Sequence, residues 1–121
     1  MIVLLILPSV LAINLNIEEQ SSNEVIIQGL NQPATFDLKI TNLGPSDNLQ
    51  FYNLLGFSMA PKGTVFFSEG EAKKIELMIF PRDDFDYRGF YTFEYFIMGQ
   101  DRTEISRKVT IKIIDLKGLL K

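Results

Sequence analysis

The chain has 121 residues, of which 46% are hydrophobic, and a formal net charge of −3. Its length supports one domain with a hydrophobic core, and its charges are mixed with no basic face, so we expect no nucleic-acid partner. Cysteine and histidine are both absent, which excludes disulfides, thiolate or imidazole metal sites, cysteine nucleophiles and Ser–His–Asp triads.

The first twelve residues, MIVLLILPSVLA, have the composition of a secretion leader. Ten of them are apolar, and Val10 and Ala12 suit the −3 and −1 positions of a signal-peptidase site. Twelve residues are too few to span a bilayer. We therefore expect residues 1–12 to be a signal peptide and the mature chain to begin at Ile13, although no basic residue precedes the apolar run. The alternative is a buried first strand over residues 2–7.

The first strand is predicted to be split in two. Residues 13–18 alternate strictly between apolar and polar side chains, the period of a half-buried strand. Residues 20–23 are a polar break, and residues 25–27 resume a short apolar run. This arrangement is a common way of running one sheet edge across to the other sheet.

The middle of the chain predicts four further strands. Residues 36–41 alternate clearly, and the turn formers that follow them at 42–47 predict a loop. Residues 48–57 are apolar but alternate poorly, so we expect a strand that is partly covered on both faces. A short strand is expected at 65–67. The next strand, at 75–79, stops at Pro81 because proline cannot donate to the ladder.

A glycine followed two residues later by a tyrosine, Gly89 and Tyr91, opens the next predicted strand. In Ig-like sandwiches a tyrosine at this corner buries its ring and bonds its hydroxyl to the backbone upstream. We therefore assign Gly89 and Tyr91 to a structural corner. The strand continues to residue 97, a tight turn is expected at 99–102, and the last strand has its core face over 109–113.

These elements predict an all-β fold, an Ig-like or fibronectin III-like antiparallel β-sandwich of seven strands over residues 13–115. Turn signals recur about every eight to twelve residues, as expected for such a sandwich. Residues 116–121 are a tail too short for another element. Their abrupt apolar end suggests a chain cut from a longer protein.

Three segments resemble a known group of modules. Residues 36–44 (FDLKITNLG) resemble the Asn-x-Gly signature of secreted archaeal and bacterial Ig-like modules, the CARDB-like and NEW3-like (alpha-galactosidase-associated) domains. Residues 69–71 (EGE) and 89–91 (GFY) look like their later half. The resemblance covers residues 13–115 and implies an accessory module in cell-surface or secreted proteins, often beside catalytic or adhesive domains. The chain lacks the cysteine pair and the core tryptophan of antibody domains.

Phe90, Phe96 and Met98 are the candidate interaction face. They lie on the parity opposite the core face of their strand, so one sheet would carry apolar side chains outward. Long side chains of a neighbouring strand, or the N-terminal segment, could instead cover them. The acidic loop with Asp83, Asp84 and Asp86 lacks the spacing of a calcium loop and is interpreted as solvated charge.

The sequence therefore predicts a non-catalytic, exported module, secreted or at the cell surface, that acts as a spacer or binds a protein partner or adjacent domain. We expect no catalytic residue, metal or cofactor, and membrane contact only through the leader or a missing C-terminal region. A carbohydrate-binding module is one alternative, with Tyr52, Tyr87 and Phe90 as the candidate aromatics. A cytosolic assembly protein with residues 1–7 as a strand is the other.

Overall fold

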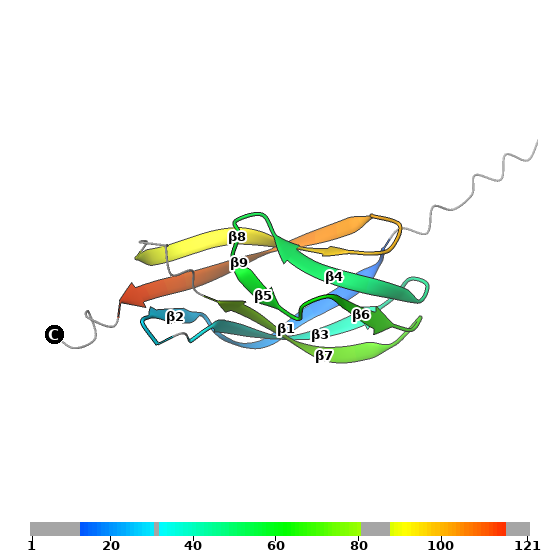
Figure 1. The fold of residues 1–121 in the computed structure, drawn as a ribbon. Helices are drawn as coiled ribbons and strands as arrows, with labels where there is room; N and C mark the ends of the chain where they lie inside the picture. Colours follow the sequence, from blue (N-terminus) through cyan, green and yellow to red (C-terminus); the bar gives the residue numbers. More distant parts are fainter. Residues whose placement is uncertain (1–12, 31, 81–87, 116–121) are drawn as a thin grey trace, which may run out of the picture.

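The computed structural model describes residues 13–30, 32–80 and 88–115 of the chain. Within these ranges it has nine strands and no helix, and the strands form two sheets that pack against each other (Figure 1). No helix that could cross a membrane is found in them. The predicted all-β, two-sheet architecture is confirmed, whereas the predictions for residues 1–12 and 116–121 lie outside the described residues.

The first sheet has four antiparallel strands in the order β1-β3-β7-β5. β3 has one buried face and one exposed face, as its alternating sequence predicts. Phe36, Leu38 and Ile40 are buried, while Asp37 and Lys39 between them are exposed. The bounds of its strands are β1 Leu15–Asn23, β3 Ala34–Asn42, β5 Ser58–Ala60 and β7 Ala72–Phe80.

The second sheet has five strands in the order β2-β9-β8-β4-β6. The pair β8 and β9 forms its long centre, with ten consecutive residues of β8 in register. The pair β2 and β9 is parallel, and the other pairs are antiparallel. The bounds of its strands are β2 Val25–Gln28, β4 Asp47–Asn53, β6 Thr64–Phe67, β8 Gly89–Met98 and β9 Glu104–Asp115.

One hydrophobic core fills the space between the two sheets. The inward faces predicted for residues 36–41, 91–97 and 109–113 all contribute to it. Every side chain on these faces is buried except that of Tyr91, which is half-buried. The largest side chains that are fully buried are Tyr95, Phe36, Phe67, Ile26, Ile40, Leu49, Leu77, Ile79, Ile97 and Ile111.

The predicted count of seven antiparallel strands is corrected by the structure, which has nine strands among the described residues and one mixed sheet. The predicted split of the first strand is confirmed, but residues 20–23, predicted as the polar break, belong to β1, and the break lies at Glu24. β1 pairs with β3 in the first sheet, and β2 pairs with β9 in the second. The chain joins the second sheet at Glu24, whose carbonyl accepts a 2.8 Å bond from the Lys112 amide. Because this crossing keeps the chain direction, β2 runs parallel to β9.

The single strand predicted over residues 48–57 is also wrong. β4 ends at Asn53, whose side chain closes a tight loop: its Oδ1 accepts bonds from the Leu55 and Phe57 amides, and its Nδ2 donates to the Phe57 carbonyl. The loop leaves Leu55 48% exposed and returns Phe57 to the core. The chain then crosses to the first sheet, where β5 pairs with β7.

Candidate functional site

The predicted structural corner lies at the start of β8. Gly89 has a φ of 111°, in the region that glycine adopts without strain, and it pairs with Ile113 of β9. Tyr91 is half-buried and packs against the core. The predicted bond from its hydroxyl to the backbone upstream falls on residues 81–87, outside the described residues.

The three residues of the predicted interaction face all lie on β8, and the structure divides them into two groups. Phe90 is 68% exposed, whereas Phe96 and Met98 are half-buried. Phe96 lies six positions further along the extended strand than Phe90, about 20 Å away. The polar side chains of Thr92 and Glu94 lie between them on the same side of the strand.

Phe96 and Met98 belong to a cluster that also contains Tyr52 of β4, which we call the Tyr52 cluster. Tyr52 lies directly opposite Phe96 in the sheet, and their rings stack with centroids 5.1 Å apart and planes inclined by 19°. The Tyr52 hydroxyl donates a hydrogen bond to the Glu104 carboxylate, and this bond raises the pKa of Tyr52. The structure thus pairs Tyr52 with Glu104, a contact that no sequence pattern indicates.

Phe90, at the other end of β8, has a different environment. The Lys112 ammonium lies 5.4 Å from the centroid of its ring, within the range of a cation–π interaction. Of the three aromatics proposed for carbohydrate binding, Tyr52 and Phe90 therefore lie at opposite ends of the sheet and Tyr87 lies outside the described residues. Tyr52 also has one ring face stacked on Phe96.

The carboxylates beside the β8–β9 turn act as caps. Asp47 Oδ1 accepts bonds from the amides of Asn48 (2.8 Å) and Gln100 (3.0 Å). Asp101 accepts from the Thr103 hydroxyl and amide, and these bonds lower the pKa of Asp101. Among the described residues, no three acidic side chains are grouped as metal ligands. The acidic loop at 83–86 lies outside those residues.

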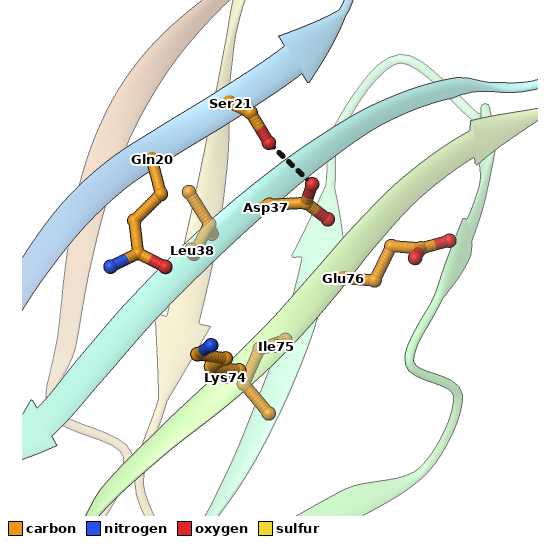
Figure 2. Close-up of a pocket in the computed structure, with 7 residues that line it drawn as sticks. All are labelled: Gln20, Ser21, Asp37, Leu38, Lys74, Ile75 and Glu76. Carbon is orange, nitrogen blue, oxygen red and sulfur yellow. Dashed lines mark hydrogen bonds between the residues drawn. The ribbon is translucent and has the colours of Figure 1, made fainter.

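The outer face of the four-stranded sheet is polar and contains an open hollow of about 500 Å³ (Figure 2). A β-bulge at Gln20 interrupts the pairing of β1 with β3, and Ser21 donates a 2.5 Å bond to Asp37 across the strands. The polar side chains that line the hollow are all exposed to solvent. Its lining is Gln20, Ser21, Asp37, Leu38, Lys74, Ile75 and Glu76.

The loop after β3, with the Asn-x-Gly run, has a structural role. Asn42 is 2% exposed, and its Nδ2 donates to the carbonyl oxygens of Pro45, Phe67 and Ser68, while its Oδ1 accepts from the Gly44 amide. Its backbone is bonded to the β6–β7 turn as well. Turn chemistry thus accounts for this run, as the sequence suggested.

Comparison with known proteins gives a fold and no family. No family model matches the chain, and no curated protein matches it. The fold is similar to that of a solved structure, the FixG-related protein from Vibrio parahaemolyticus, with a TM-score of 0.56 and 15% sequence identity. The match covers 84% of this chain and 96% of that chain. At this level of identity the similarity shows the fold alone.

Proposed function

We propose that the chain is an exported, non-catalytic Ig-like module that acts as a spacer or protein-interaction domain at the cell surface. The crossing of the first strand from β1 to β2 between two packed sheets supports the Ig-like assignment. The leader-like composition of residues 1–12 supports export. The use of Asp47 and Asp101 as turn caps supports a non-catalytic role.

The Tyr52 cluster is the observation that carries the interaction role. It places two stacked rings and a methionine side chain on the outer face of the five-stranded sheet, where they remain half-exposed. Phe66 of β6 is 51% exposed on the same face. Aromatic and methionine side chains are enriched in protein interfaces, so this face is suited to an adjacent domain or another protein.

Site-specific cross-linking in the native cells would test the interaction role. A photoreactive group at exposed Gln50, beside Met98 in the sheet, is expected to yield an adduct with a partner. The variant Phe96→Ser should lose this adduct because it removes half of the ring stack. The matched variant Glu76→Ser, on the outer face of the other sheet, should keep it.

Two results would contradict the interaction role. One is an adduct that Phe96→Ser leaves unchanged, and the other is no adduct at all in cells that contain the folded protein. Thermal unfolding of each purified variant shows whether it is folded. Export is tested separately by determining the N-terminus of the native protein. Ile13 as the first residue supports export, and an intact Met1 supports the cytosolic alternative.

A further inference from the structure

The outer face of the four-stranded sheet carries two pairs of like charges. Asp37 of β3 lies directly opposite Glu76 of β7, and Lys39 of β3 lies directly opposite Lys74 of β7. All four side chains are exposed. Like charges directly opposite each other destabilise a sheet. The reverse order of the two residues on β7 would make both pairs attractive, so the isolated chain has the less favourable arrangement.

We call Asp37 and Glu76 the acidic row, and Lys39 and Lys74 the basic row. The two rows are neighbours, because residues two positions apart on a strand share a face and lie about 7 Å apart. The ion pairs found among the described residues lie elsewhere, so none joins the two rows within one copy. Ser21 donates a hydrogen bond to Asp37, which holds this carboxylate in place without neutralising its charge.

The open hollow in Figure 2 lies over these rows. It is lined by both residues of the acidic row and by Lys74. Leu38 and Ile75, which lie between the two rows and turn their side chains toward the core, line it as well. Lysine carries its charge on a four-carbon stem, so lysines presented from outside can reach the acidic row within the hollow.

We propose that a second copy of this chain packs its four-stranded sheet face to face against this one. The two-fold axis lies between the two sheets, runs across the strands and passes over Leu38 and Ile75, which are paired in the sheet. Rotation about this axis keeps β3 over β3 and β7 over β7. It also exchanges the positions one residue before and one residue after the axis on each strand.

This rotation sets the basic row of each copy over the acidic row of the other. Lys39 faces Asp37 of the second copy, and Lys74 faces Glu76 of the second copy. Because a two-fold interface is self-complementary, each contact occurs twice and four ion pairs form. A two-fold axis parallel to the strands would instead set like charges over each other. The charges therefore select one orientation of the two copies.

The neighbouring strand β1 is compatible with this orientation. Glu18 lies in line with the basic row and Ser21 with the acidic row, so the rotation sets Glu18 over the Ser21 hydroxyl of the second copy. Glu19 is opposite the inward-pointing Leu38, so its side chain lies on the other face of the sheet. The strands of packed sheets cross at about 30°, and the two charged rows, being nearest the axis, stay closest to their partners.

The interface is polar, so we expect a weak dimer. An exposed ion pair contributes little to stability, and both rows consist of charged side chains. We expect a dissociation constant on the order of 0.1 mM, so the chain is monomeric at about 1 µM. This inference concerns the four-stranded sheet and goes beyond the proposed function, which rests on the Tyr52 cluster on the other sheet.

Sedimentation velocity of the whole chain, from about 1 µM to about 1 mM at an ionic strength of about 0.1 M, would test the proposal. We expect a reversible monomer–dimer equilibrium that weakens at about 1 M salt, because salt screens ion pairs. A chain that stays monomeric at about 1 mM would overturn the proposal. So would a dimer that about 1 M salt leaves unchanged or strengthens.

Two complementary variants test the contacts themselves. Lys39→Glu with Lys74→Glu makes both rows acidic, and Asp37→Lys with Glu76→Lys makes both rows basic. Each variant alone should dimerise at least about tenfold more weakly than the original chain, because like charges then face each other. An equimolar mixture of the two should form a heterodimer at least as tight as the original dimer. A variant that dimerises as the original chain does, or a mixture that does not associate, would show the proposal to be wrong.

Lys108→Glu with Lys112→Glu is the matched control, since both lysines are exposed on the other sheet and the change in net charge is the same. This variant should keep dimerisation within about threefold of the original chain. Its mixture with the all-basic variant should associate at least about tenfold more weakly than the heterodimer. Far-UV circular dichroism checks that each variant is folded, and either complementary variant tests the proposal if the other does not fold.

Two single variants separate this inference from the proposed function. Glu76→Ser should weaken the dimer and keep the adduct at Gln50, whereas Phe96→Ser should keep the dimer and lose the adduct. A dimer that Glu76→Ser leaves unchanged contradicts the face-to-face interface. An adduct that Phe96→Ser leaves unchanged contradicts the proposed function instead.

Discussion

Single polar residues hold the loops of this sandwich in place, and Asn42 is the clearest case. Its buried side chain joins the end of β3 to the β6–β7 turn, which connects the two sheets. A buried amide is stable only when its donors and acceptor are satisfied. Asn42 meets this requirement through carbonyl oxygens that would themselves lose a donor without it.

Asn42→Ala is expected to lower the free energy of unfolding by about 2–3 kcal/mol, because it removes the hydrogen bonds of a buried amide to three carbonyl oxygens and to the Gly44 amide. Urea unfolding followed by circular dichroism measures this change. Asn16→Ala is the matched control, since Asn16 is exposed on β1 and bonds only Glu18 among the side-chain contacts found for it. The control should change stability by less than about 0.5 kcal/mol. Equal effects of the two substitutions would contradict the role of Asn42.

Tyr95 should make the protein less stable at alkaline pH. Burial raises the pKa of Tyr95 from 10.0 to about 12, an effect that Arg107 partly opposes. A group with a raised pKa in the folded state contributes stability that is fully present below its unfolded pKa and is lost as the pH rises through the folded pKa. The loss should therefore occur between pH 10 and about pH 12.

Tyr95→Phe should remove this part of the pH dependence, on the order of 2 kcal/mol. Urea midpoints measured across the same pH window for both proteins give the comparison. Tyr52→Phe is the comparison: the pKa of Tyr52 is also raised, mainly by the bond to Glu104, but Tyr52 is only half-buried, so this variant should remove a smaller part of the alkaline loss than Tyr95→Phe does. If Tyr95→Phe loses as much stability between pH 10 and about pH 12 as the original chain, Tyr95 is not the cause of this loss.

At the scale of strands, the chain's own side chains limit the pairing of a strand edge with another chain. Lys73 lies on the inward parity of β7, near the start of the strand, and its ammonium reaches the Phe66 carbonyl of β6. The ammonium also lies 5.1 Å from the centroid of the Phe67 ring and 3.6 Å from the Glu71 carboxylate. One side chain thus connects the two sheets and blocks the edge of β6.

Lys73→Ala is expected to lower the free energy of unfolding by about 1 kcal/mol. It should also increase aggregation on heating, because it leaves the edge of β6 unblocked. Thermal unfolding combined with light scattering measures both effects. Lys74→Ala is the matched control, since the neighbouring Lys74 is exposed on the outer face of the same strand. If Lys74→Ala aggregates as readily as Lys73→Ala, Lys73 has no protective role.

At the scale of the whole molecule, the two sheets share one core and should unfold together. Leu77 belongs to the four-stranded sheet and is fully buried. The tyrosines of the described residues, Tyr52, Tyr91 and Tyr95, all belong to the five-stranded sheet. Tyrosine fluorescence therefore reports mainly on the sheet that does not contain Leu77, with Tyr87 outside the described residues.

Leu77→Ala is expected to lower the free energy of unfolding by about 2–5 kcal/mol, through lost burial and the cavity left behind. The urea midpoint should fall equally when followed by tyrosine fluorescence and by far-UV circular dichroism, because a small single domain unfolds in one cooperative step. Midpoints that separate in the variant would show that the two sheets unfold independently.

Much of the fold can be predicted from local patterns in the sequence. The strict alternation of residues 36–41 and 109–113 predicts the strands β3 and β9 and their buried faces, because successive side chains point to opposite sides of a strand. The poorly alternating residues 48–57 do not reveal the stop at Asn53. That stop depends on hydrogen bonds of one side chain to amides beyond it, and such a loop has no periodic pattern.

The candidate site was predicted only in part for a similar reason. Parity along β8 places Phe90, Phe96 and Met98 on the outer side of the strand, as the structure has them. Parity does not show that Phe96 stacks on Tyr52, or that the Tyr52 hydroxyl bonds Glu104, because these contacts depend on the register between strands. They join residues more than 40 positions apart in the chain.

The sequence by itself determined the all-β class, the faces of the regular strands and the residues available for chemistry. Each of these follows from side-chain identity and the two-residue period of a strand. Only the tertiary structure decided which strand lies beside which, where β4 stops, and which side chains meet on the outer face. Pairing partners and register are set by contacts between distant segments, and no short stretch of sequence encodes such contacts by its own period.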